Sequence, residues 1–347
     1  MPAKEDPKKK KVSQNTLNIL DKYLTQVYLR AQALHLLANL FPLDDVLIQP
    51  GLIPPPIHIS PDVVSVSTSL VHQELPYLPE WPELLAAYAV KSIPVSEVLR
   101  GSRNIAIIGQ AGAGKTATLA ALCSLVARRA NSTPYLNDFL PVLFHARDLI
   151  EFASKEKTID QIIDIAASYH EDIAIGKLDA LIREHFDSGK ILICLDGLDE
   201  FPRNMIQECH QFIAQLLQQC PETRLVLTGP SDYLDGFYSL GIYPMVVNHW
   251  NHVQVSRFSR KLAGAYFQKF ETNLSEEDKE IRVNALLAWM KRQDITLTVL
   301  EYAIQGISAL AGLETGKTSF EILQSYVQQL VPNNSTRASL EVLAYQT

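Results

Sequence analysis

Residues 109–116 read Gly109-Gln110-Ala111-Gly112-Ala113-Gly114-Lys115-Thr116 and match the pattern G-x-x-x-x-G-K-[ST]. An apolar run, Asn104–Ile108, precedes this segment, and a helical pattern of apolar residues follows it. Glycine allows backbone conformations that side chains forbid, so successive N–H groups can point toward an anion. The N-terminus of the helix that follows adds a partial positive charge. We therefore predict that this loop binds the phosphates of a nucleotide.

Each position of the loop is assigned a role in that binding. Contacts to the nucleotide are expected from Gly109, Gln110, Ala111, Gly112, Ala113, Gly114, Lys115 and Thr116. Lys115 would reach the β- and γ-phosphates, and the hydroxyl of Thr116 would ligate Mg²⁺. The alternative, a glycine-rich turn without a ligand, does not account for the Lys-Thr pair that ends the segment.

A second motif follows another apolar run, Ile191–Leu195, and reads Asp196-Gly197-Leu198-Asp199-Glu200. A buried parallel strand that ends in an acidic residue presents a carboxylate at the C-terminal edge of its sheet. We predict that Asp196 holds Mg²⁺ through water, and that Asp199 and Glu200 orient or deprotonate an attacking water molecule. An acidic loop that caps the next helix is a competing interpretation for Asp199 alone.

Five short apolar runs alternate with helical patterns between residues 95 and 250. They are Asn104–Ile108, Pro141–His145, Ile191–Leu195, Arg224–Thr228 and Pro244–Val247. This alternation predicts an α/β fold with a five-stranded parallel sheet. Beyond residue 250 only helical patterns remain, so we expect a C-terminal helical subdomain over residues 251–347, in a truncated or short form.

The N-terminal region divides into three predicted segments. Residues 1–12 read as a disordered basic tail, and residues 13–48 as a helix with apolar residues spaced alternately by three and four positions. That spacing fits either an oligomerising helix or a helix docked on its own domain, and we favour docking. Residues 42–94 hold ten of the nineteen prolines, and residues 49–94 are predicted to form an extended connector.

Composition excludes several classes of protein. Of the 347 residues, 47% are hydrophobic and 20% charged, which is typical of globular chains. Residues 1–11 carry a charge of +3 and the remainder −10 of the total −7, so a dedicated nucleic-acid surface is not expected. No apolar run approaches the roughly 18 residues of a membrane-spanning helix. The four cysteines lack paired spacing, which favours free thiols and a cytoplasmic protein.

The phosphate-binding loop and the Asp-Gly-Leu-Asp-Glu motif together resemble the NACHT domains of the signal-transducing (STAND) P-loop NTPases. The run Leu140–Leu149 also resembles the second strand of that family, and the resemblance covers about residues 95–270. It implies a P-loop NTPase domain over residues 95–250 that binds ATP or ADP with Mg²⁺. It further implies slow hydrolysis, nucleotide-dependent self-association, a sensor or effector partner of unknown identity and, in some members, bacterial-type immunity.

One departure from the family pattern concerns the fourth strand. The family commonly carries Thr-Ser-Arg there, whereas this chain reads Thr228-Gly229-Pro230, so only Thr228 is expected to contact the nucleotide. The guanine-specifying Asn-Lys-x-Asp pattern is absent after that strand, which disfavours GTP. A conventional ATPase or GTPase with continuous turnover and a non-hydrolysing, nucleotide-bound scaffold stay open as alternatives.

Overall fold

The computed structural model describes residues 7–49, 51–53, 92–100, 104–151, 158–247, 250, 252–270, 274–291 and 297–311, with a few positions between 321 and 336. Most of the predicted connector and the first six residues of the predicted tail lie outside these ranges. Within the part of the chain that is described, no helix combines the length and the apolar character needed to span a membrane.

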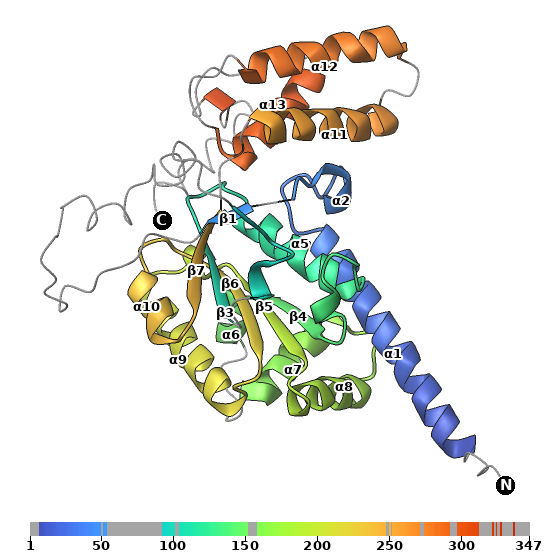
Figure 1. Cartoon of the computed structure of the whole chain (residues 1–347), viewed down its shortest axis with the longest axis vertical. Coiled ribbons are helices and arrows are strands. Elements are labelled where there is room, and N and C mark those ends of the chain that lie inside the picture. Colours follow the sequence, from blue (N-terminus) through green and yellow to red (C-terminus); the bar gives the residue numbers. More distant parts are fainter. Residues whose placement is uncertain are drawn as a thin grey trace, which may run out of the picture.

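The five predicted parallel strands are confirmed; they lie side by side and extend to one edge of the sheet (Figure 1). They are β3 (Asn104–Ile108), β4 (Leu140–His145), β5 (Ile191–Asp196), β6 (Arg224–Gly229) and β7 (Tyr243–Val247). Their spatial order is β7-β3-β6-β5-β4, and every neighbouring pair is parallel. Almost all of their residues are buried, as expected for a sheet covered by helices on both faces.

The sheet contains two strands more than predicted. β1 (Gly51–Ile53) pairs antiparallel with β7, and β2 (Ile93–Pro94) pairs antiparallel with β1. Both come from the region expected to be a connector, so the described sheet has seven strands rather than five. Leu52 and Ile53 are fully buried, which is why so short a segment is held in the sheet. Pro94 lies in the outermost strand, where a missing N–H donor is tolerated.

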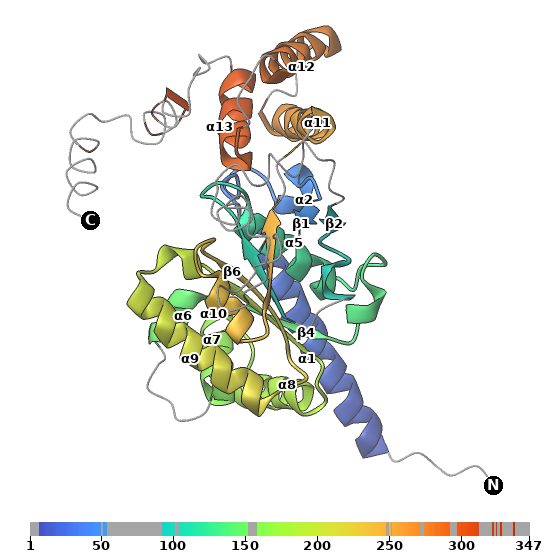
Figure 2. The same ribbon diagram turned by 60° about the vertical axis from the view of Figure 1, so that its left-hand side comes forward.

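Helices cover both faces of the sheet (Figure 2). On one side lie α1 (Pro7–Gln32) and α5 (Lys115–Ala127), and on the other α9 (Arg203–Gln219) and α10 (Leu234–Ser239). Three further helices, α6 (Ala146–Glu151), α7 (Thr158–Tyr169) and α8 (Ile175–Asp187), connect β4 to β5. This alternation of strands and helices confirms the predicted α/β fold.

The N-terminal helix differs from the expected range of residues 13–48 at both ends. It begins at Pro7, inside the predicted tail, and ends at Gln32, after which the chain turns and forms the short helix α2 (Leu43–Val46). The Gln32 carboxamide explains the turn, because its oxygen accepts a hydrogen bond from the Asp44 N–H at 2.9 Å. Its nitrogen donates to Ser124 of α5 at 3.0 Å, which fixes the end of α1 on the domain.

The described part of α1 is docked on its own chain, as favoured above. Tyr23, Leu24, Val27 and Ala31 are buried in the main core, which they share with α5 and the sheet. The Tyr23 hydroxyl also donates to the Pro141 carbonyl of β4 at 3.0 Å. The apolar spacing of this helix therefore serves intramolecular packing.

A second core joins the C-terminal helices to the N-terminal region. The helices are α11 (His252–Phe270), α12 (Glu276–Lys291) and α13 (Val299–Leu310). Residues 35–48, which we call the N-terminal bridge, contribute Leu37, Phe41, Val46 and Ile48 to that core. Lys261 of α11 donates to the carbonyls of Asp44 and Leu47 in the bridge, at 3.1 and 3.0 Å. The helical subdomain is thus attached to the same segment that follows α1.

Candidate nucleotide-binding site

The phosphate loop connects β3 to α5 and depends on glycine at two positions. Gly112 and Gly114 have φ angles of 78° and 94°, which residues with a side chain rarely adopt. Gly114 is the N-cap of α5, so the first N–H groups of the helix are exposed toward the loop. The predicted strand-loop-helix arrangement around residues 109–116 is therefore present.

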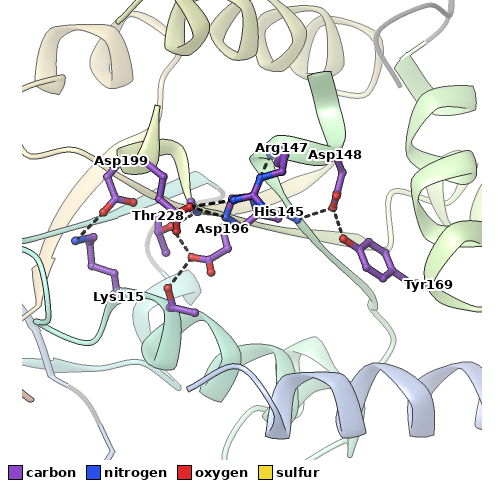
Figure 3. A network of polar contacts seen from close by, with 11 residues as sticks. Lys115, His145, Arg147, Asp148, Tyr169, Asp196, Asp199 and Thr228 are labelled. Carbon is purple, nitrogen blue, oxygen red and sulfur yellow. Dashed lines mark hydrogen bonds and ion pairs between the residues drawn. The ribbon is translucent and has the colours of Figure 1, made fainter. Parts of the chain in front are cut away.

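Lys115 is held inside the loop by three oxygen-bearing partners. Its ammonium donates to the carbonyls of Gly109 and Gln110, at 2.8 and 3.1 Å, and lies 2.9 Å from a carboxylate oxygen of Asp199 (Figure 3). The Lys115 side chain is only 8% exposed. A phosphate that reaches this ammonium has to compete with Asp199, an interaction that sequence reasoning had not indicated.

The predicted Mg²⁺ ligands lie together at the ends of β5 and α5. The Thr116 hydroxyl donates to Oδ1 of Asp196 at 3.1 Å, and the Thr228 hydroxyl donates to the same atom at 2.6 Å. Burial raises the pKa of Asp196, and the two hydroxyl hydrogen bonds oppose that shift. An adjacent hydroxyl and carboxylate fit Mg²⁺, which takes oxygen ligands and typically only one or two from protein beside phosphates and water.

Thr228 lies in a different position from the one predicted for it. Its hydroxyl also accepts a hydrogen bond from the Gly197 N–H at 2.8 Å, and the residue is buried. Thr228 therefore holds the Asp196 carboxylate by a hydrogen bond. It is not among the residues that line the cavity at the loop.

Asp199 and Glu200 point in different directions although they are adjacent in sequence. Asp199 faces Lys115, as described above. A carboxylate oxygen of Glu200 lies 3.4 Å from Nε2 of His145 and 3.6 Å from a guanidinium nitrogen of Arg147. His145 is the last residue of β4 and is paired with Asp196 in the parallel register, and Arg147 follows in α6. The structure thus separates the two predicted catalytic acids.

A cavity of about 340 Å³ opens beside the phosphate loop. One part of its wall is the loop itself with the start of α5, and Asp199 and Glu200 stand at that end. The remaining wall is almost entirely apolar and comes from the N-terminal bridge, the end of β7, Trp250 and the C-terminal helices. Its members are His35, Leu36, Leu37, Leu43, Val46, Leu47, Ile48, Val247, Trp250, Phe258, Val299, Leu300 and Ala303.

The N-terminus of α13 lies directly on the phosphate loop. The Leu300 N–H donates to the Gly112 carbonyl at 3.1 Å. The helix is capped by Thr298 and Glu301, each of which hydrogen-bonds to the backbone of the other. A Cβ atom at Gly112 would come within 3.0 Å of Leu300 and 3.1 Å of the Thr298 hydroxyl. Glycine at this position therefore serves both the loop conformation and the close approach of α13.

Comparisons with known proteins gave one family and a set of similar solved structures, among them the following two. No curated protein matches the chain. The structure of the Aeropyrum pernix ORC1 protein in complex with DNA is 17% identical, with 78% of this chain and 68% of that chain covered and a TM-score of 0.37. Domain III of the Thermotoga maritima replication initiation protein DnaA is 15% identical, with 70% and 90% covered and a TM-score of 0.35.

The family comparison concerns the region that contains both motifs. The model of the NACHT domain matches residues 103–273, which span β3 to β7 and α11. The match includes the phosphate loop, Asp196 and the acidic residues that follow it. Residues 103–273 of this chain are therefore a NACHT domain, a P-loop NTPase domain of the STAND type.

Proposed function

We propose that this chain binds Mg-ATP, hydrolyses it slowly, and uses the state of the nucleotide to control self-association or signalling. The observation that carries the proposal is that segments from both cores of the molecule form the wall of one cavity. Its wall combines the phosphate loop, the N-terminal bridge and α13, so a nucleotide in it would touch both cores of the molecule.

The apolar wall supports adenine as the base. His35 is a polar member of that wall, and its Nε2 already lies 2.9 Å from the Phe41 carbonyl. Guanine carries an additional amino group and a ring N–H that need acceptors. A buried polar group without a partner costs about 1–3 kcal/mol. ATP is therefore the favoured triphosphate.

The arrangement of charged groups supports a binding step in which partners are exchanged. The Lys115 ammonium would leave Asp199 for the phosphates, because phosphate oxygens carry more charge than a single carboxylate. Thr116 and Asp196 would hold Mg²⁺, which when bound neutralises phosphate charge. Glu200, which is half exposed at the mouth of the site, would orient or deprotonate the attacking water.

The lack of an arginine after Thr228 supports slow turnover. Gly229-Pro230 follows Thr228 where the family commonly has an arginine that senses the γ-phosphate, and Thr228 itself is occupied with Asp196 and Gly197. An arginine that stabilises the charge of the transition state contributes about 10³–10⁵-fold in related chemistry. Without it, one nucleotide would persist long enough to define a conformational state.

The contact between Leu300 and Gly112 supports the link to assembly. Because α13 begins on the loop, a change in the loop when phosphates bind or leave would alter the position of the helical subdomain. A change in the placement of that subdomain would alter the surface available to another copy of the chain or to an effector. A role in bacterial-type immunity would be one form of such signalling.

The test is to identify the nucleotide that co-purifies, and then to follow its turnover and the mass of the protein. We expect bound diphosphate, fewer than a few turnovers per minute, and a larger mass by light scattering with a non-hydrolysable ATP analogue than with ADP. Lys115→Ala is the control and should lose the response. Fast turnover at constant mass would indicate a conventional NTPase, and the absence of both turnover and a mass change would indicate a scaffold.

A further inference from the structure

We infer that His145 is a positioning residue for Glu200, holding its carboxylate at the mouth of the nucleotide site. The inference rests on the proposed role of Glu200 in activating water. It is carried by the fixed orientation of the His145 ring, by the space that Gly197 leaves for it, and by the contact between Nε2 and the carboxylate.

The backbone of His145 is fixed where β4 ends. Its residue partner in the parallel register is Asp196, so the side chains at these two strand ends are neighbours at the edge of the sheet. The His145 N–H donates to a carboxylate oxygen of Asp148 at 2.9 Å. The same oxygen accepts from the Tyr169 hydroxyl at 2.6 Å (Figure 3). The Arg30 guanidinium lies over the Tyr169 ring. The position of the residue is thus set from α1, α6 and α7 together.

The imidazole is fixed as well. Its Nδ1 accepts a hydrogen bond from the Arg147 N–H at 3.0 Å, so the proton of the neutral ring is on Nε2. That nitrogen is the one that faces Glu200, at 3.4 Å. The distance is longer than an ideal hydrogen bond, as is common for catalytic groups before substrate binds. The hydrogen bond from the Arg147 N–H therefore selects the tautomer of His145 and the direction in which its Nε2–H points.

Gly197 is what allows the ring to reach Glu200. A Cβ atom at this position would lie 2.1 Å from Nε2 of His145, so any other residue would displace the imidazole. The φ angle of Gly197 is 85°, which also favours glycine. The glycine of the Asp-Gly-Leu-Asp-Glu motif therefore makes room for a residue that lies more than fifty positions earlier in the chain.

The accessible surface of the two side chains agrees with a positioning role. His145 is 25% exposed, whereas Glu200 is 56% exposed. The donor is therefore held by the fold while the carboxylate stays open to water and nucleotide. Arg147, at 3.6 Å and 66% exposed, is the looser of the two partners. An exposed ion pair of that kind contributes little, so His145 should dominate.

The experiment compares two replacements of His145. His145→Asn can still accept from the Arg147 N–H but does not reach Glu200, whereas the longer amide of His145→Gln can place an N–H donor near the position of Nε2. We expect His145→Asn to lower kcat about three- to tenfold, the value of one ordinary hydrogen bond, at unchanged affinity for ATP. His145→Gln should recover most of the loss, and Arg147→Ala should change kcat less than twofold.

The same replacements in a Glu200→Gln background separate this inference from the proposed function. If His145 acts through Glu200, His145→Asn should have no further effect there. An equal effect in both backgrounds, or a wild-type rate for His145→Asn, would overturn the inference while the proposed function stands. A wild-type rate for Glu200→Gln, or no hydrolysis by the wild-type chain, would instead overturn the proposed role of Glu200 and this inference with it.

A measurement without nucleotide tests the contact directly. Histidine-selective ¹⁵N NMR should show His145, assigned from the spectrum of His145→Asn, as the Nε2-protonated tautomer. Its Nε2 signal should shift in Glu200→Gln and stay in place in Glu184→Gln, which alters an exposed acid on α8. An Nδ1-protonated ring, or a signal indifferent to Glu200→Gln, would contradict the positioning role.

Discussion

The ammonium of Lys115 and the carboxylate of Asp199 lie 2.9 Å apart, so the acidic motif and the phosphate loop neutralise each other within the chain. A nucleotide has to replace this contact. We therefore expect Asp199 to compete with phosphate for Lys115, a different role from the activation of water predicted for it. Two predictions follow from this pair, one for each partner.

Lys115→Ala should weaken the binding of triphosphate about ten- to a hundredfold. A charged hydrogen bond to phosphate contributes about 1.5–3 kcal/mol, and alanine removes it. Isothermal titration calorimetry with ATP and Mg²⁺ measures the change. Equal affinities for the variant and the wild-type protein would show that Lys115 is not a phosphate ligand.

Asp199→Asn should bind ADP at least as tightly as the wild-type protein, and up to about fivefold more tightly. The amide keeps the size of the side chain but no longer competes as an anion for Lys115, and ion-pair competition of this partly exposed kind is worth about 1 kcal/mol or less. Calorimetry with ADP tests this. Loss of binding would instead mean that Asp199 contacts the nucleotide or its metal.

Glu200→Gln should leave Mg-ATP bound while hydrolysis slows by about 10²–10⁴-fold. The amide lacks the charge that orients or deprotonates water, whereas the loop, Lys115, Thr116 and Asp196 are untouched. Single-turnover assays separate the chemical step from binding, and the affinity should change by less than about 1 kcal/mol. As a comparison, Asp196→Asn should impair both binding and turnover, because it alters a metal ligand.

Because one face of α1 is docked on the domain, substitutions on its two faces should lower the free energy of unfolding by different amounts. Val27 is 1% exposed in the core, whereas Leu29 is 59% exposed. Val27→Asn should lower the free energy of unfolding by about 2–4 kcal/mol, since it removes apolar contacts and buries an amide. Leu29→Asn should change it by less than about 0.5 kcal/mol. Urea denaturation measures both, and equal effects would contradict the docked position.

Stability should fall as the solution is acidified below neutral pH, through His170. Burial, followed by the nearby Arg30 charge, lowers the pKa of His170 to about 4 from its ordinary 6.5. Its Nδ1 faces the Gln26 carboxamide oxygen at 2.9 Å, and its ring lies against Tyr23.

Because the unfolded chain takes up the proton first, the free energy of unfolding is highest above pH 6.5 and decreases from there to about pH 4. The loss is at most about 3 kcal/mol. His170→Gln should flatten that decrease when urea denaturation is compared at pH 7 and pH 4.5. An unchanged slope would place the pH dependence elsewhere.

The parts of this molecule that sequence predicted are those encoded over short distances. The strand, loop and helix around Gly109–Thr116 are contiguous, and so is the buried strand that ends at Asp196. Their geometry follows from local backbone preferences and from apolar patterning. The NACHT resemblance rested on these same segments.

What sequence did not predict depends on contacts between distant segments. The strands β1 and β2 have three and two residues, too few for an alternating pattern, and are held only by pairing with β7 and with each other. The partner of Glu200 was missed because His145 reaches it through the register of β4 with β5. The sequence does place His145 at the end of a predicted strand. That it lies beside Asp196 can be predicted only when the order of the strands in the sheet is known.

The N-terminal bridge has a consequence for how the molecule unfolds. Leu37, Phe41, Val46 and Ile48 of the bridge lie in the core of the helical subdomain, while Leu43 and the preceding helix α1 lie in the core of the NTPase domain. We therefore expect that melting either core removes an anchor from the other, so that the two parts unfold as one cooperative unit despite their separate interiors. A ligand bound in the cavity between them would then raise the melting temperature of the whole described structure in a single transition, rather than that of the NTPase domain alone.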